Sequence, residues 1–207
     1  MLIRWLGHSC FRLTMNDGTT VVTDPFDKSV GYGLPHGAVD IVTISHDHYD
    51  HNHVGALVPK TVLKTAGHFS GKVTVTGFDS FHDDVHGAKR GSNVMFLIEG
   101  DGARVLHLGD LGHDLSNREI DAFGHVDALL IPVGGVYTID ARQAAALAER
   151  IGACVTVPMH YKTPRLTFEL GGVKPFIDAM CGKAVTCKTL DPLNPPADIA
   201  LMEYGVE

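Results

Sequence analysis

Short apolar runs separated by turn residues dominate the first half of the chain. Residues 2–6, 10–15 and 19–23 have the composition of strands, and the Asn-Asp-Gly turn at 16–18 favours a hairpin between the second and third runs. The apolar run at 39–44 is typical of a buried strand. The pattern therefore predicts a meander of antiparallel strands that leads into a buried strand.

The middle of the chain continues with short elements. The segment 52–58 fits a short helix, and strands are expected near 61–64 and 72–77. Two β runs flank a second Asp-Gly turn, so residues 93–108 are predicted to form another hairpin. No linker, low-complexity tract or solenoid repeat interrupts the chain, which favours a single domain over residues 1–207.

The last third of the chain changes its period. Helical spacing of Ala and Leu ends at Gly152, and a second helical segment is bracketed by glycines. The order suggests two layers of strands with helices outside, an α/β sandwich. The predicted elements are strands at 127–133 and 153–160, helices at 139–152 and 171–182, and closing strands at 184–190 and 197–203.

Composition narrows the function classes. The chain has 207 residues, 44% of them hydrophobic, and a formal charge of −7, so no general attraction to nucleic acid or an anionic membrane is expected. Its four cysteines form no CxxC pair, which favours reduced thiols over a disulfide framework. No apolar run approaches the length of a membrane span or a secretory signal, so a cytoplasmic protein is expected.

One stretch, HDHYDHNH at 46–53, directly follows the buried strand. In an extended segment, residues two apart face the same side, so His46 and His48 can converge on one ion. Asp50 and His51 diverge and can reach a second ion, which suits a two-metal centre. The alternative is a solvated loop that binds metal loosely, but such loops belong to polar tails and not to the end of a buried strand.

Other potential ligands stand at predicted strand ends. His82 follows one strand, His107 and Asp110 end another, and His160 closes a third. Strand ends hold side chains rigidly and leave room for a ligand. A lone histidine in such a place is usually a packing residue, whereas several together favour a shared site.

These motifs resemble the metallo-β-lactamase fold superfamily, whose HxHxDH hallmark is present as HDHYDH at 46–51. A narrower set of motifs resembles the lactonase-like, UlaG-type branch of small metal-dependent hydrolases. The resemblance implies a four-layer αββα sandwich of the metallo-β-lactamase type. The motifs of the narrower, UlaG-type set are LGHSCF at 6–11, TDPF at 23–26, HLGD at 107–110, PVGG at 132–135 and PMHY at 158–161.

The resemblance also implies a ligand set for two divalent ions. It assigns His46, His48 and His82 to one metal, Asp50, His51 and His160 to the other, and Asp110 to a bridge between them. His86 competes with His82 for the third position, and His82 is preferred because it comes first after the strand. Zinc is the expected metal, with manganese or iron as alternatives.

Three further residues are candidates for supporting the ligands. The resemblance implies that Asp24 lies behind them, where a carboxylate would hold a ligand imidazole in the right tautomer. The alternative for Asp24 is that it only begins a turn before Pro25. His8 and His107 are either site residues or buried, hydrogen-bonded packing residues.

Two such ions would lower the pKa of a shared water toward about 7 and give a bridging hydroxide nucleophile. Asp50 and Asp110 would be the catalytic carboxylates, with Asp50 as the proton acceptor. The sequence thus predicts a dinuclear hydrolase that acts on a small, anionic ester, lactone or phosphodiester. Tyr161, Lys162, Arg165 and Arg90 are candidate substrate contacts, although a packed ring and solvated loop charges are equally good interpretations.

Three alternatives remain open at this point. The same fold can hold iron for redox chemistry, and a degenerate member could be a non-catalytic metal-binding module. Nucleic-acid processing is disfavoured by the acidic balance and by the lack of room for an added RNA-binding module. The expected partner is a small-molecule substrate, with a second copy of the chain as a possible partner in a homo-oligomer.

Overall fold

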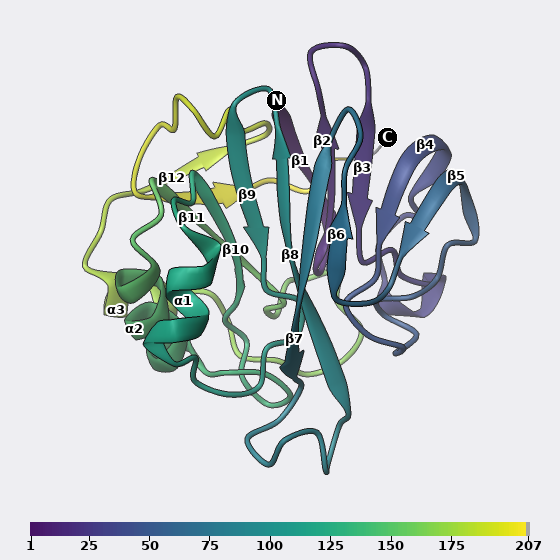
Figure 1. Ribbon diagram of the computed structural model, residues 1–207. Coiled ribbons are helices and arrows are strands. Elements are labelled where there is room, and N and C mark those ends of the chain that lie inside the picture. Colours follow the sequence, from purple (N-terminus) through teal and green to yellow (C-terminus); the bar gives the residue numbers. More distant parts are fainter. Residues whose placement is uncertain (206–207) are drawn as a thin grey trace.

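Two β-sheets packed against each other organise the chain, and the computed structural model describes residues 1–205 (Figure 1). The five-stranded sheet has the order β1 (Leu2–Gly7), β2 (Cys10–Thr14), β3 (Thr20–Thr23), β4 (His36–Thr43) and β5 (Ala56–Leu63). The eight-stranded sheet has the order β12 (Ala184–Cys187), β13 (Ile199–Met202), β11 (Val155–Met159), β10 (Ala128–Pro132), β9 (Ala103–His107), β8 (Ser92–Gly100), β7 (Thr74–Phe81) and β6 (Gly67–Phe69).

Three α-helices form a layer beside β10 and β11 (Figure 1). They are α1 (Asn117–Phe123), α2 (Ala141–Ile151) and α3 (Lys174–Met180), and a short 3₁₀ turn, η1 (Lys28–Val30), lies earlier in the chain. Asp140 begins α2 by accepting hydrogen bonds from two backbone N–H groups, and Gly152 ends it with a φ of 67°. None of the helices in residues 1–205 is long and apolar enough to cross a membrane.

Alternation along β8 explains the layer order. Phe96 and Ile98 point into the core between the two sheets, whereas Met95 and Leu97 point into a second core beneath the helices. A strand with apolar residues on both faces reads as a continuous apolar run, as this one does. The eight-stranded sheet is therefore the middle layer, covered by the other sheet on one face and by helices on the other.

The mixed α/β class with two sheets is confirmed, and so are the hairpins around residues 16–18 and 93–108. The helix expected at 52–58 is wrong, because β5 occupies Ala56–Leu63 and pairs in parallel with β4. Pro59 disfavours helical backbone at the preceding Val58, and an edge strand tolerates a proline. The outer face of the five-stranded sheet consequently carries no α-helix among residues 1–205.

Strand direction brings distant segments to one edge of the sandwich. β9, β10 and β11 are parallel, and β7 runs in the same direction as β9 because both are antiparallel to β8. Figure 1 shows β7 and β9 both running toward the lower edge of the view. The segments that follow β4, β7, β9 and β11 carry the HDHYDH motif, His82, Asp110 and His160.

The inter-sheet core predicts a clear mutational contrast. Phe96→Ala removes a ring that is 1% exposed between the sheets, and we expect it to lower the free energy of unfolding by about 3–5 kcal/mol. Val58→Ala, at a side chain that is 69% exposed, should change stability by less than about 0.5 kcal/mol. Urea unfolding of both variants measures this, and equal effects would contradict the layer assignment.

Candidate metal centre

Asp110 lies at the centre of the histidines that the sequence singled out. Its Oδ2 atom is 3.0 Å from Nε2 of His160 and 3.3 Å from Nε2 of both His51 and His82. Nε2 of His46 lies 3.9 Å from the same oxygen. One buried carboxylate oxygen thus faces imidazoles from both predicted ligand sets, which is the position that a bridging ligand occupies.

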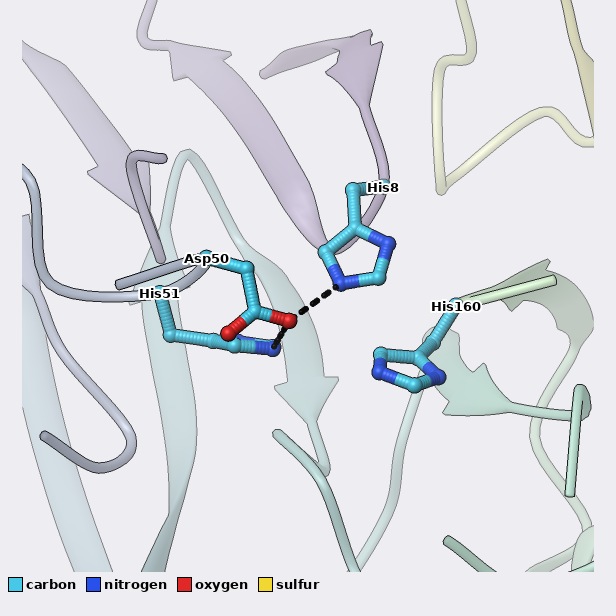
Figure 2. A group of neighbouring side chains, drawn as sticks. All are labelled: His8, Asp50, His51 and His160. Atoms are coloured by element: carbon cyan, nitrogen blue, oxygen red, sulfur yellow. Dashed lines mark hydrogen bonds and ion pairs between the residues drawn. The ribbon is translucent and has the colours of Figure 1, made fainter. Parts of the chain in front are cut away.

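The remaining potential donors fall into two groups on either side of Asp110. One group is His46, His48 and His82, whose candidate ligand atoms lie within 4.8 Å of one another. The other is His8, Asp50, His51 and His160, with the same mutual spacing. Figure 2 shows this second group, with the adjacent Asp50 and His51 on one segment and His8 and His160 approaching them from two others.

The hydrogen bonding of these groups is suited to metal ions. Nε2 of His46, Nε2 of His51 and Oδ1 of Asp110 are buried, and none makes a hydrogen bond within residues 1–205. Such atoms are costly to bury without a partner, and a coordinated cation would satisfy them. The residues present therefore fit divalent cations, held by imidazole and carboxylate donors.

Burial also prepares the imidazoles for ligation. It lowers the pKa of His46 to about 3, with the charge of the neighbouring His51 as the next cause. Burial likewise lowers the pKa of His82. Both side chains are consequently neutral at physiological pH, and a neutral imidazole has a lone pair available for a metal.

Asp24 orients His51 from behind. Its Oδ2 accepts a hydrogen bond from Nδ1 of His51 at 2.9 Å, so the proton is on Nδ1 and Nε2 faces Asp110. Ser45 donates its backbone N–H to Oδ1 and its hydroxyl to Oδ2 of the same carboxylate. Asp24 thus lies behind the candidate ligand His51, and its contacts extend beyond the turn before Pro25.

His8 lies inside the site. Its Nε2 is 3.2 Å from Oδ2 of Asp50, and its ring centroid is 4.3 Å from that of His160 (Figure 2). Burial lowers its pKa to about 4, with His160 as the next cause. The sequence left open whether His8 is a site residue or a packing residue, and the structure places its ring against the candidate ligands Asp50 and His160.

His107 supports the site through the backbone. It is fully buried, its Nε2 lies 2.9 Å from the carbonyl oxygen of Ser9, and its Nδ1 accepts the N–H of Gly109. It therefore joins the turn that carries His8 to the loop that carries Asp110. Within residues 1–205 it makes no hydrogen bond or ion pair with either group of candidate ligands.

Sequence reasoning missed Asn93, which positions Asp110. The Asn93 Oδ1 accepts the backbone N–H of Asp110 at 3.0 Å, and Nδ2 donates to Ser80 Oγ and the carbonyl of Leu108. The residue is completely buried in β8. The sequence does offer a sign of this role, because asparagine is disfavoured in strands and Asn93 stands at the start of a long apolar strand.

The site also contains unusual backbone. His8, Asp24 and His160 have φ values of 54°, 38° and 50°, a region that non-glycine residues rarely adopt. Gly134 packs so closely that a Cβ there would lie 2.2 Å from the carbonyl oxygen of His160. Such strain is found where the surrounding fold holds functional side chains in place.

The structure separates His82 from His86. His82 is 2% exposed and lies beside Asp110, whereas His86 is exposed, with its ring against Phe81. His48, although exposed, stays with His46 and His82. The preference for the first histidine after the strand agrees with this arrangement.

A cavity of about 360 Å³ opens above the cluster, and among the predicted substrate contacts only Arg90 lines it. Tyr161 stacks on Trp5 with ring centroids 5.8 Å apart. Lys162 donates to the carbonyls of Leu166 and Phe168 and pairs with Glu169, while Arg165 lies over the ring of Tyr204. Tyr161, Lys162 and Arg165 thus contact neighbouring loops and rings and are not among the residues that line this cavity. The described residues that line the cavity are His48, Tyr49, Asp50, His82, Arg90, Asp110, Tyr137, His160 and Phe168.

Comparison with known proteins identifies the family. The beta-lactamase superfamily domain matches residues 2–160 of the chain. A UPF0173 metal-dependent hydrolase from Methanoregula boonei is 32% identical over 210 residues, covering 86% of this chain and 90% of the relative. The chain is a metal-dependent hydrolase of the metallo-β-lactamase superfamily.

Solved structures agree with the fold of this metallo-β-lactamase superfamily hydrolase. A Thermotoga maritima protein of the same superfamily is 36% identical, with a TM-score of 0.79 and coverage of 97% of both chains. An isothiocyanate hydrolase from Delia radicum gut bacteria has a TM-score of 0.67 at 13% identity, covering 100% of this chain and 98% of its own. At that identity the second likeness shows the fold alone.

The contact between Asp24 and His51 gives a test of the supporting network. Asp24→Asn places an amide where Nδ1 of His51 and the hydroxyl of Ser45 both donate, and we expect metal affinity to fall about 10- to 100-fold. Isothermal titration with Zn²⁺ measures the change. Asp40→Asn, at a carboxylate that contacts Thr20 and Lys60, is the control and should bind metal normally.

The two histidines after β7 give a second test. His82→Ala should remove about one bound ion per chain, because it deletes one of three donors in its group. His86→Ala should leave the metal content unchanged. Elemental analysis of the purified hydrolase variants decides the matter, and the reverse pattern would overturn the assignment of His82.

Proposed function

We propose that this protein is a dinuclear hydrolase that cleaves small esters, lactones or phosphodiesters. The observation that carries the proposal is the position of the Asp110 Oδ2 between imidazoles of both ligand groups. Two divalent cations held there would activate a shared water and polarise the bond to be cleaved. The ligand groups would be His46, His48 and His82 on one side and Asp50, His51 and His160 on the other, with Asp110 shared.

The chain's own residues would place and move the protons. His8 and His51 both contact Oδ2 of Asp50, which leaves Oδ1 to accept a proton from the attacking water. Burial raises the pKa of Asp50, but the charge of His51 and the hydrogen bond from His8 outweigh it and hold that pKa far below its usual range. Asp50 is thus anionic at neutral pH, as a proton acceptor must be.

The donor set supports zinc as the first choice of metal, with manganese or iron as alternatives. Imidazole and carboxylate donors suit all three ions, and no cysteine belongs to either group. Selection among such ions depends on geometry and availability as well as affinity. We therefore expect the site to prefer Zn²⁺ over Mn²⁺ and Fe²⁺, which competition binding between the ions can test.

The cavity supports a small substrate. Its volume of about 360 Å³ is at the lower end of small-molecule sites. Among structural neighbours, a human tRNase Z, 14% identical with a TM-score of 0.59, shares the fold, and fold alone does not assign a substrate. The narrower UlaG-type resemblance, a cytoplasmic location and homo-oligomer formation stay predictions.

Metal removal tests the proposed chemistry. Chelator treatment should abolish hydrolysis across a panel of aryl esters, lactones and phosphodiesters, and Zn²⁺ or Mn²⁺ should restore it, because bound metal ions would supply both the activated water and the polarisation of the bond to be cleaved. Activity that survives full metal removal contradicts the proposal. Oxygen uptake by an iron-loaded sample, with no hydrolysis of any substrate, would favour the redox alternative.

The bridging residue provides the second test. Asp110→Ala should lower kcat about 10²- to 10⁴-fold and reduce the metal content, because the carboxylate faces both ligand groups. Asp114→Ala, at an exposed carboxylate that pairs with Arg150, is the control. Unchanged turnover by the Asp110 variant would count against a shared ligand at this position.

A further inference from the structure

Arg90 is a cation on the cavity wall that has no carboxylate partner among residues 1–205. Its Nη2 donates to the carbonyl oxygen of Val136 at 3.2 Å, which leaves most of the guanidinium donors available. The neighbouring Lys89, in contrast, pairs with Asp84 outside the cavity. An arginine that lines a cavity beside a hydrolytic centre, with donors unused, is suited to bind an anion.

The loop that carries Arg90 is ordered by a buried carboxylate. Asp83, 2% exposed, accepts backbone hydrogen bonds from Val85 and Gly87 on Oδ1 and from Lys89 and Arg90 on Oδ2. Four bonds to one carboxylate fix the backbone of the loop. The backbone of Arg90 is therefore held in place before any ligand arrives, which lowers the entropy cost of binding.

The loop on the opposite side of the cavity contains strained backbone at Val136 and also contacts Arg90. Val136, a β-branched residue, has a φ of 61°, and its carbonyl accepts the Arg90 hydrogen bond. The guanidinium carbon of Arg90 lies 5.6 Å from the ring centroid of Tyr137. Arg90 thus joins the two loops that border the cavity.

Aromatic rings supply the rest of the wall. Tyr49 is 53% exposed and Tyr137 is 42% exposed, and both line the cavity with Phe168. Lys162 donates a hydrogen bond to the backbone carbonyl of Phe168, and the Phe168 ring packs edge-on against His8 with centroids 5.4 Å apart. Exposed aromatic rings around a cavity favour a flat apolar ligand.

We propose that the cavity selects substrates with a flat apolar body and one carboxylate, and that Arg90 binds this carboxylate through its guanidinium. The inference rests on the proposed hydrolase function. A single cation with unused planar donors matches a carboxylate monoanion. In the ester case, water adds to the carbonyl carbon, the bond to the leaving oxygen breaks, and an acid and an alcohol are released.

Matched substrates test the selection. The 2-, 3- and 4-acetoxybenzoates carry a carboxylate on an aromatic ring, and the corresponding acetoxybenzamides are neutral and nearly isosteric. For at least one isomer, the metal-loaded wild type should show kcat/KM at least about tenfold higher for the benzoate, equivalent to about 1.4 kcal/mol. Arg90→Met should remove this preference by slowing the benzoate only, and Arg90→Lys should retain part of it.

Lys89→Met is the matched control, since it removes a neighbouring loop cation that does not line the cavity. It should keep the wild-type preference. An Arg90→Met variant that keeps the preference, or that slows benzoates and benzamides equally, overturns the proposal. A larger Arg90-dependent preference for 4-acetoxyphenyl phosphate than for any benzoate also overturns the choice of carboxylate.

A binding measurement separates this inference from the proposed function. Saturation-transfer NMR of 4-hydroxybenzoate should show about tenfold weaker binding to Arg90→Met than to wild type, both metal-loaded, whereas 4-hydroxybenzamide should bind both equally. Arg90-dependent binding without hydrolysis of any panel substrate would refute the proposed function and retain the carboxylate subsite. Hydrolysis of panel substrates together with Arg90-independent binding of 4-hydroxybenzoate would support the proposed function and refute the carboxylate subsite.

Discussion

A carboxylate buried among imidazoles is the constraint on which the rest of this structure depends. Asp110 is 2% exposed, and its Oδ2 atom faces histidines from three separate segments. A buried charge is tolerated only when opposite charge or hydrogen bonds compensate its lost hydration. Burial raises the pKa of Asp110, but His160 and His51 outweigh it and hold that pKa well below its usual value. The anionic oxygen and the buried ring nitrogens together create a place for divalent cations.

The two-sheet fold makes this arrangement possible. Continuous apolar strands form two cores around the eight-stranded sheet, and their stability offsets strained backbone at His8, Asp24 and His160. Buried polar residues then fix the ligands: Asp24 orients His51, and Asn93 holds the backbone of Asp110. The geometry of the centre thus depends on residues outside both ligand groups.

Much of this could be predicted from the sequence, and the limits have physical causes. Apolar runs and Asp-Gly turns predicted most strands, and the HDHYDH motif predicted the cluster because ligand spacing is local. A short apolar segment such as 52–58 fits a helix or a strand equally well by its local pattern, and the pairing of β5 with β4 makes its end a strand. Roles that depend on tertiary packing could not be predicted from the local sequence pattern. They include the contact of His8 with Asp50, the buried Asn93, and the loop bonds that direct Lys162 away from the cavity.

The central claim is that both groups of side chains bind cations and share Asp110. Anomalous X-ray diffraction from crystals grown with Zn²⁺ or Mn²⁺ tests this most directly. The account predicts two peaks about 3.5–4 Å apart, each within coordination distance of Asp110. A single peak, or two peaks neither of which contacts Asp110, would contradict it.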